Sequence, residues 1–373
     1  MKTKVKPTAL LCSDTHARPR REDERHAFRQ IVDKAVALRI PIIAAGDLID
    51  KQSNRAETIT FLYKQLDRLK EVNQRFYYTQ GQHDYDDPPW LSAHPAALHF
   101  HKKVIRLDDF VFYGLDWQPY GKLQEELGEM HPDANFLVCH QVWANWMGDI
   151  AAPQGSFAQI PGQIRHVLTG DLHQWKLEEH KNADGIKMLV VSCGATTQQT
   201  IAEPDRHYYA LLMPDGRVEQ KRLNSRVFID CSLINTEQDV AIFMAELEPT
   251  LAAALQKANA LDLPTEMYRP TMRVTYSSKL PEVVRRVEKA VGDRAVLHFK
   301  QLLPPEKLEA YKKAKKAEKG EAVTPLLVLP QEVDQKDKPE VYELVERMLA
   351  AGDKTMEFAK WRSEFLGENA AGG

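Results

Sequence analysis

The chain has 373 residues and a formal net charge of −3, with 43% hydrophobic and 28% charged residues. These proportions are ordinary for a soluble globular protein, and they exclude disorder as the main state of the chain. The length exceeds what one hydrophobic core usually holds, so we expect two or three domains. Because there is no overall basic charge, a nucleic acid partner would need a local basic patch or bound cations.

The start of the chain predicts neither secretion nor membrane insertion. Its basic flank is followed by an apolar run too short for a signal peptide, and no later stretch approaches the roughly 18 apolar residues of a membrane span. The cysteines form no C-x-x-C pair, which is typical of small buried residues in a reducing compartment. They are Cys12, Cys139, Cys193 and Cys231. We therefore expect a cytoplasmic protein, in a bacterium or in the host of a phage, with no membrane partner.

Up to about residue 231, short apolar runs alternate with longer amphipathic ones, which is typical of layered α/β proteins. The amphipathic runs predict helices over 22–38 and 56–72. The apolar runs predict strands over 8–12, 42–46, 76–81, 110–115, 135–140, 164–169, 186–192, 208–213 and 217–223. So many strands in the middle of the chain favour two packed sheets flanked by helices over one doubly wound sheet.

The pattern changes near Cys231. Predicted helices over 236–260 and 281–291 and a strand over 269–276 suggest a small α+β domain over 232–308, after a first domain over 1–231. Residues 309–337 are charged and almost without apolar anchors, so we expect a linker. Residues 338–373 carry an apolar helical stripe that either folds back onto the chain or docks on a partner.

Polar side chains follow five of the predicted strands at the point where each strand ends. The motifs are Ser13-Asp14-Thr15-His16, Gly46-Asp47, Gly81-Gln82-His83-Asp84, Val138-Cys139-His140 and Gly170-Asp171-Leu172-His173. In open α/β sheets, ligands bind beyond the carboxyl ends of the strands, so these five groups are expected to converge. Mixed carboxylate and imidazole ligands suit Mn, Fe or Zn. The ligand candidates are too many for one tetrahedral ion, and two ions roughly 3.5 to 4 Å apart would form a phosphate-ester hydrolase centre.

This series of motifs resembles that of the calcineurin-like metallophosphoesterases, and within that superfamily it is most similar to the SbcD-like DNA repair exonucleases. The metal motifs lie within about residues 8–200, and a glycine-containing strand end over 191–196 also resembles that family. The resemblance implies an α/β fold class. Its architecture would be the α+β four-layer metallophosphoesterase fold, a β-sandwich flanked by helices. The resemblance also implies a small α+β capping domain and a C-terminal helical segment that binds a partner.

The resemblance implies a role for each motif residue. Asp14, His16 and His173 would bind one divalent ion, and Asp47 would bridge to a second. That second ion would be held by Gln82, His140 and Asp171, with a metal-activated water as the attacking group. His83, oriented by Asp84, would contact the scissile phosphate and serve as general acid toward the leaving oxygen.

Two residues depart from the family pattern, and both fall on the second ion. Gln82 stands where the family has Asn, and Asp171 stands where it has the first His of the last motif. The resulting set of three oxygens and one nitrogen favours harder ions, most of all Mn, with Mg as the alternative. Two interpretations follow: a working site with altered metal preference, or a weakly occupied site with reduced or no nuclease activity.

Arginines follow the first motif directly and are candidates to clamp DNA phosphates, although loop arginines are commonly only solvated. They are Arg18, Arg20 and Arg21. Trp143 and Trp146 either stack on a base or pack within the domain.

The resemblance predicts a metal-dependent DNA exonuclease and endonuclease subunit in DNA recombination, repair or replication. It implies that the chain forms a homodimer and that an SbcC-like ATPase partner binds the C-terminal helices. Two alternatives stay open. A stand-alone phosphodiesterase for small substrates is one, although it would not need the long C-terminal part, and a catalytically weak scaffold of the same complex is the other.

Overall fold

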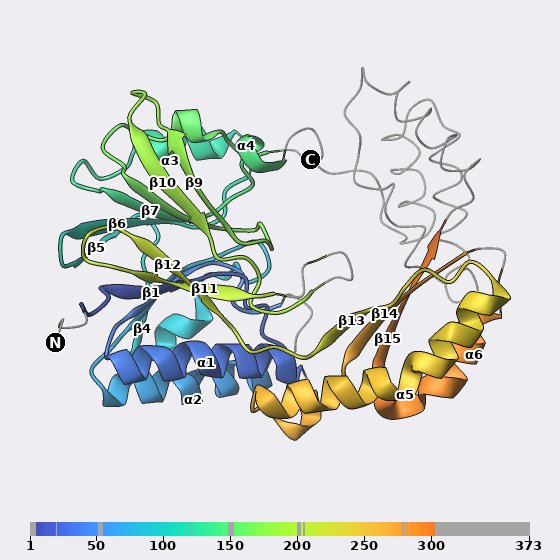
Figure 1. The fold of residues 1–373 in the computed structure, drawn as a ribbon. Coiled ribbons are helices and arrows are strands. Elements are labelled where there is room, and N and C mark those ends of the chain that lie inside the picture. Colours follow the sequence, from blue (N-terminus) through green and yellow to red (C-terminus); the bar gives the residue numbers. More distant parts are fainter. Residues whose placement is uncertain are drawn as a thin grey trace, which may run out of the picture. The chain divides into compact units, whose positions relative to one another are not determined.

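The computed structural model describes residues 5–19, 21–50, 55–119, 121–147, 153–199, 203, 206–277, 280 and 282–302. Two six-stranded sheets form most of this part of the chain (Figure 1). Across the first sheet the order is β12 (Val218–Arg222), β11 (Tyr208–Leu212), β1 (Ala9–Cys12), β2 (Ile42–Ala45), β3 (Phe76–Thr79) and β4 (Ala97–His99). Across the second sheet it is β5 (Val104–Leu107), β6 (Phe110–Leu115), β7 (Phe136–His140), β8 (His166–Gly170), β10 (Lys187–Ser192) and β9 (Lys176–Lys181).

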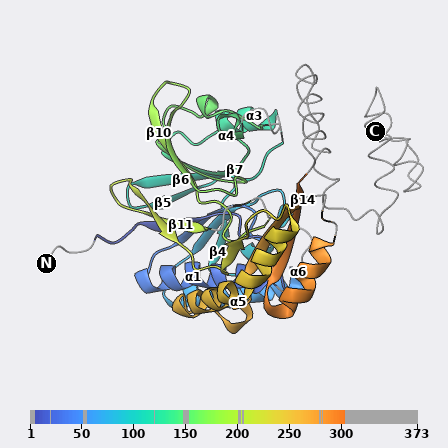
Figure 2. The ribbon, with the colours of Figure 1, turned by 45° about the vertical axis from the view of Figure 1, so that its right-hand side comes forward.

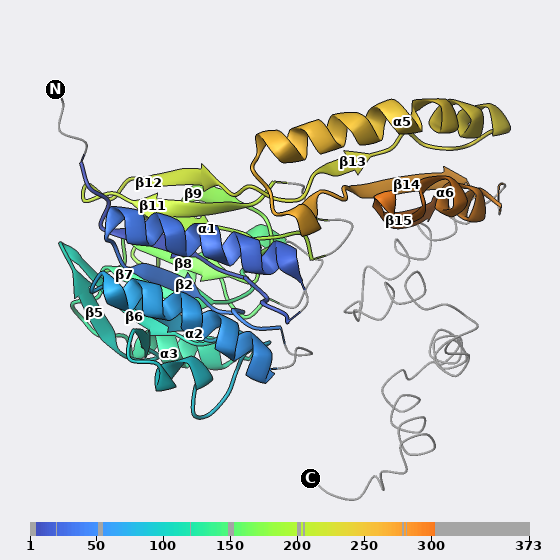
Figure 3. The same cartoon turned by 90° about the horizontal axis from the view of Figure 1, so that it is seen from below.

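Helices cover the outer face of each sheet. Helices α1 (Glu22–Leu38) and α2 (Arg55–Glu71) lie side by side on the first sheet, whereas the short α3 (Lys122–Gly128) and α4 (Ala144–Met147) lie beside the second (Figures 2 and 3). Three hydrophobic cores fill the spaces between these layers. The middle core joins Leu11 and Ile43 of the first sheet to Phe112 and Phe136 of the second. The predicted four-layer sandwich is therefore confirmed.

The amphipathic pattern of residues 22–38 explains why α1 forms and where it sits. Phe28, Ile31, Val32 and Ala35 recur at helical spacing and are buried against the first sheet. The helix has the predicted bounds, and three acidic residues in its first turn favour the positive end of the helix dipole.

The strands that the sequence did not predict are short or exposed. β4 has three residues, and β9 reads KLEEHK with only Lys176 and His180 half-buried. Neither β9 nor β5 presents the alternation of buried and exposed residues by which a strand is recognised. Their pairing with β10 and β6 is decided by neighbours in the sheet.

A third sheet carries the small α+β unit, in the order β13 (Phe228–Asp230), β14 (Thr271–Ser277) and β15 (Val296–Leu302), all parallel. Helices α5 (Glu237–Ala260) and α6 (Val283–Val291) pack on it, and Val240, Val274 and Val287 lie in their shared core. This sheet begins at β13, before the predicted boundary after residue 231. The domain boundaries themselves stay a prediction.

The predicted linker (309–337) and partner-binding segment (338–373) lie outside the described residues. Among the described residues, no helix has the length and apolar character needed to cross a bilayer.

Candidate metal centre

The five predicted strand-end motifs meet at one place. β1, β2 and β3 are parallel neighbours in the first sheet, and β7 and β8 are parallel neighbours in the second, so their carboxyl ends face the same edge. His16 Nε2 lies 3.1 Å from His173 Nε2, although these residues are 157 positions apart. His140 Nε2 lies 3.3 Å from Asp47 Oδ2.

Ligand atoms of the predicted metal-binding residues form two adjacent groups. Asp14, His16 and His173 make one group, and Asp14, Asp47 and His140 make the other, with all ligand atoms of a group within 4.8 Å of one another. Asp14 is shared, and Asp47 Oδ2 is also 3.8 Å from His16 Nε2. Both aspartates therefore lie between the two groups, and the assignment of Asp47 as the bridging ligand stays a prediction.

The unpaired polar atoms of this cluster fit divalent cations. The buried atoms Asp14 Oδ2, Asp47 Oδ2, Gln82 Oε1 and His140 Nε2 have no hydrogen-bond partner. Leaving a buried polar atom unpaired costs about 1–3 kcal/mol, and more for a charged group. Three of these atoms are oxygens and one is an imidazole nitrogen, which is the donor set expected for Mn or Mg. Bound cations would satisfy all four atoms.

The backbone is strained where it presents these ligands. Asp14, His16, Asp47 and Asp171 all have positive φ, between 41° and 75°, a region that L-residues rarely adopt. Such strain persists where the surrounding structure demands it and is common at functional sites.

Glycines let the ligands approach one another. A Cβ atom at Gly170 would lie 2.3 Å from His140 Nδ1, and one at Gly81 would lie 2.0 Å from Asp47 Oδ1. These separations are far below van der Waals contact, so both motifs require Gly next to the ligands.

Burial and neighbouring charges shift the pKa values of several ionisable groups in this cluster. Burial raises the pKa of Asp14 to about 6 and lowers the pKa of His16 to about 3. For His173, burial opposes protonation, but the hydrogen bond to Glu203 and the charge of Asp14 raise the pKa to about 9. Without cations, the centre therefore retains protons on some groups that would otherwise bind metal.

The two residues that depart from the family pattern contact each other. Gln82 Nε2 donates a hydrogen bond of 2.6 Å to Asp171 Oδ1, and the backbone N–H of Asp171 donates to Asp14 Oδ1 at 3.0 Å. Asp171 Oδ1 is also 3.7 Å from His140 Nε2. The amide oxygen of Gln82 remains available for a cation, since its nitrogen is bound to Asp171.

His83 lies at the exposed side of the cluster. Its ring packs edge-on against His16 at 5.0 Å, its side chain is 39% exposed, and its Nδ1 has no hydrogen-bond partner. The buried Asp84 carboxylate accepts hydrogen bonds of 2.7 Å from the backbone N–H groups of Leu48 and Gly81. Asp84 therefore fixes the backbone of the loop that carries His83, and its role in orienting the His83 ring stays a prediction.

Two acidic residues near the centre have no motif that marks them in the sequence. Glu203 Oε1 accepts a hydrogen bond of 2.8 Å from Nδ1 of His173. Asp50 forms a third group with His16 and His83, with ligand atoms within 4.8 Å of one another. Asp50 follows Asp47 closely in the chain, which is a weak signal, whereas Glu203 lies 30 residues from His173 and offers none.

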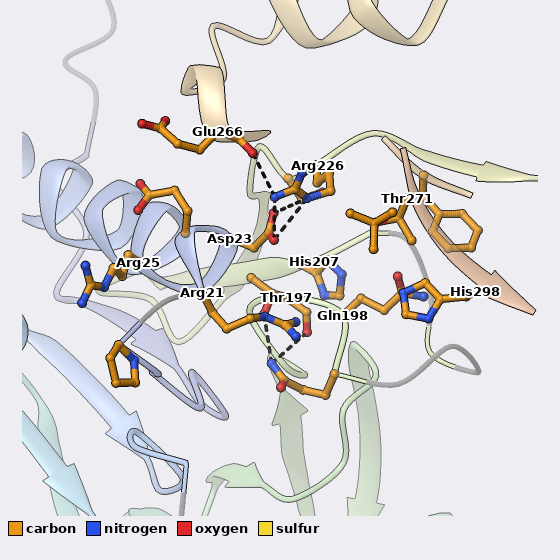
Figure 4. Close-up of a pocket in the computed structure, with 16 residues that line it drawn as sticks. Arg21, Asp23, Arg25, Thr197, Gln198, His207, Arg226, Glu266, Thr271 and His298 are labelled. Carbon is orange, nitrogen blue, oxygen red and sulfur yellow. Dashed lines mark hydrogen bonds and ion pairs between the residues drawn. The ribbon is translucent and has the colours of Figure 1, made fainter. Parts of the chain in front are cut away.

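The candidate DNA-binding arginines differ in their surroundings. Arg18 is committed to internal partners, donating to the buried Glu24 carboxylate and to Gln199. Arg21 is 44% exposed and lines a cavity of about 520 Å³ together with His298 of the small unit (Figure 4). Arg20 lies outside the described residues. A phosphate-contacting role for these arginines stays a prediction.

Trp143 packs inside the first domain. It is 1% exposed, its ring lies 4.9 Å from Phe157, and its Nε1 donates to Thr169 Oγ1 at 2.9 Å. The packing interpretation of this residue is confirmed.

Comparison with known families agrees with this geometry. Residues 7–174 match the sequence model of the family described as Calcineurin-like phosphoesterase. This part of the chain therefore resembles a calcineurin-like metallophosphoesterase domain, and that family indicates a hydrolase that uses divalent metal ions.

Particular relatives are more distant. The chain is 25% identical over 234 residues to the DNA double-strand break repair protein Mre11 of Methanosarcina mazei, covering 57% of this chain and 36% of that protein. It is 25% identical over 235 residues to the protein of the same name in Methanosarcina acetivorans, covering 57% of this chain and 37% of that protein. The uncharacterized metallophosphoesterase YhaO of Bacillus subtilis is 24% identical over 211 residues, covering 52% of this chain and 50% of that protein. The chain thus spans only about a third to a half of the length of these relatives.

A solved structure, that of TT1561 of Thermus thermophilus, matches with a TM-score of 0.37 and 15% identity. The match covers 59% of this chain and all of that one.

Proposed function

We propose that this chain is an SbcD-like DNA nuclease subunit that hydrolyses phosphodiester bonds in DNA as an exonuclease and endonuclease, in recombination, repair or replication. The observation that carries the proposal is the pair of ligand groups, together with four buried atoms of the cluster that could bind a metal ion and have no hydrogen-bond partner. Similarity to two DNA double-strand break repair proteins favours DNA over other phosphodiesters.

In this proposal the strand-end residues hold two divalent ions, with Mn preferred and Mg as the alternative. When bound, such ions lower the pKa of water and stabilise the charge that develops on the phosphate. The first position uses Asp14, His16 and His173. The second uses Asp47, Gln82, His140 and Asp171.

His83 provides the proton for the leaving oxygen in the proposed reaction. Its side chain is 39% exposed, more than that of any other histidine in the cluster, so a substrate oxygen can approach the open side of its ring. The backbone N–H of His83 donates to Asp47 Oδ1 at 2.9 Å, which fixes the ring next to the candidate ligands.

The proposal includes partners beyond DNA. An SbcC-like ATPase would bind the C-terminal segment over 338–373, and the nuclease domain would form a homodimer in the cytoplasm. Coexpression with such an ATPase and light scattering of the isolated chain would test these two contacts.

The decisive experiment measures cleavage of single- and double-stranded DNA with and without Mn²⁺, alongside a small chromogenic phosphodiester. We expect DNA cleavage that needs Mn²⁺, that His140→Asn abolishes, and that His131→Asn leaves unchanged, since His131 is an exposed residue near the opposite end of β7. Cleavage of the small diester without DNA cleavage would overturn the proposal in favour of a stand-alone phosphodiesterase. Metal binding without any cleavage, even with an ATPase partner, would favour the scaffold.

A further inference from the structure

Glu203 is hydrogen-bonded to the ring of His173, a candidate metal ligand. His173 offers Nε2 to the first ligand group, where it lies 3.1 Å from His16 Nε2, and turns Nδ1 toward Glu203 Oε1 at 2.8 Å. The Glu203 carboxylate therefore lies on the side of the imidazole that faces away from the group. It is placed to orient the ring, and a direct ligand role is not needed to explain it.

The Glu203 carboxylate is itself held in place. Its second oxygen, Oε2, accepts a hydrogen bond of 2.7 Å from the backbone N–H of Gln199, and the Gln198 side chain donates to the Glu203 carbonyl at 3.2 Å. Gln199 in turn accepts a hydrogen bond from Arg18, which is fixed by the fully buried Glu24. A carboxylate anchored at both oxygens can hold an imidazole in one orientation.

The segment that leads to Glu203 also holds the backbone of His173. Gly194 has a φ of 74°, and a Cβ there would lie 3.0 Å from the carbonyl oxygen of His173. Ser192 Oγ donates to the carbonyl of Leu172 at 3.0 Å. The strand end after β10 thus packs on the motif that carries His173, while Glu203 holds its side chain.

We propose that Glu203 is a positioning residue that fixes the tautomer and orientation of His173, so that Nε2 faces the first metal position. Metal-binding histidines commonly donate their other N–H to a carboxylate, which fixes the ring and increases its basicity as a ligand. The inference rests on the proposed metal centre and is independent of DNA as substrate.

The test is Mn²⁺ binding to the full-length, chelator-stripped chain without DNA, measured by calorimetry for the wild type, Glu203→Ala and Glu203→Gln. We expect Glu203→Ala to weaken one of two binding events by roughly 10- to 100-fold, and Glu203→Gln to weaken it less because an amide oxygen still accepts the Nδ1–H. Glu178→Ala is the matched control, since Glu178 pairs with His180 at 3.1 Å on an exposed strand.

Nitrogen NMR of the His173 ring, identified with His173→Gln, supplies a second readout. At a pH above the pKa of His173, so that the metal-free ring is neutral, we expect the Nδ1–H tautomer in the wild type and a mixture of tautomers in Glu203→Ala. Wild-type Mn²⁺ affinity in Glu203→Ala, or an equal loss in Glu178→Ala, would overturn the inference. If Glu203→Ala does not fold, Glu203→Gln decides. Unchanged Mn²⁺ affinity in competition with Mg²⁺, together with an unchanged His173 tautomer population, overturns the inference. A weakened Mn²⁺ binding event supports it. Absence of Mn²⁺ binding by the wild type would instead refute the metal centre itself.

Discussion

Gln82 and Asp171 are the residues at which the candidate centre differs from the family pattern, and they form one hydrogen-bonded pair. Gln82 stands in place of Asn and is longer, and Asp171 stands in place of His and is shorter and anionic. A hydrogen bond of 2.6 Å joins the two side chains. Residues in direct contact commonly show non-additive effects when both are replaced.

The first prediction concerns this pair. We expect Asp171→His to weaken Mg²⁺ binding at the second position by about tenfold, because an imidazole replaces a hard oxygen ligand. Adding Gln82→Asn should recover part of this Mg²⁺ affinity, since the shorter amide does not depend on the carboxylate of Asp171 as its acceptor. Calorimetry on the wild type, both single variants and the double variant measures this coupling. Strictly additive effects would show that the two residues act independently.

A second prediction concerns Glu24, which is fully buried with one carboxylate oxygen unpaired. Burial raises the pKa of Glu24 to about 7, despite its hydrogen bonds from Arg18. Because the folded chain then holds this proton more tightly than the unfolded chain, the free energy of unfolding falls as pH rises from about 4.5 to about 7, by on the order of 1–3 kcal/mol.

Urea unfolding at several pH values, for wild type and Glu24→Gln, measures that effect as a difference. Other titrating groups are common to both proteins and cancel. We expect the stability of the wild type relative to Glu24→Gln to decline across this pH range. A constant difference between pH 5 and pH 8 would contradict the assigned protonation.

Secondary-structure elements place the centre because parallel strands end at a common edge. Helix caps elsewhere have a purely structural role, and α5 illustrates it. Thr236 Oγ1 accepts a hydrogen bond of 3.2 Å from the N–H of Asp239, and Asp239 Oδ2 accepts one of 2.8 Å from the N–H of Thr236. This reciprocal pair satisfies backbone donors that the first turn of α5 leaves free.

We therefore predict that Thr236→Ala lowers the free energy of unfolding by about 1 kcal/mol. Thr60→Ala is the control, since Thr60 is an exposed residue away from the ends of α2, and its hydroxyl donates to the carbonyl of Ala56. That control should change stability by less than about 0.5 kcal/mol. Equal effects of the two substitutions in chemical denaturation would refute the capping role.

At the scale of the molecule, Arg226 joins the first domain to the small α+β unit. Its guanidinium donates to Asp23 of α1 at 3.0 Å and to the carbonyl of Glu266 at 3.2 Å (Figure 4). It also donates to the carbonyl of Arg269 at 2.6 Å. Nearby, Gln30 and Asn224 exchange two hydrogen bonds of 2.8 Å. Polar contacts therefore fix the start of the small unit against α1.

The corresponding prediction is that Arg226→Ala lowers the free energy of unfolding by about 1–3 kcal/mol, because the partly buried Asp23 carboxylate and two backbone carbonyls lose a charged donor. Arg106→Ala provides the comparison. Arg106 also pairs with an aspartate, but both side chains are more than half exposed, and such pairs contribute about 0–1 kcal/mol. Thermal unfolding and the rate of proteolysis near residues 224–236 should separate the two variants. Similar behaviour of both would show that Arg226 does not hold the junction.

Several features followed from local sequence because they depend on neighbours within a few residues. The period of apolar residues gave α1 its bounds, and the strand-end motifs gave the candidate ligands, from Asp14 to His173, that the structure brings together. The short or charged strands β4, β5 and β9 did not follow, because their pairing depends on distant strands.

The sequence by itself determined which residue types stand at the strand ends, and therefore the candidate metal chemistry, because that pattern is local. Only the tertiary structure decided that Gln82 contacts Asp171, that Arg18 is committed to Glu24, and that Glu203 stands behind His173. Those contacts join residues from 6 to 89 positions apart, and a one-dimensional pattern carries no record of which side chains the packing of two sheets brings face to face.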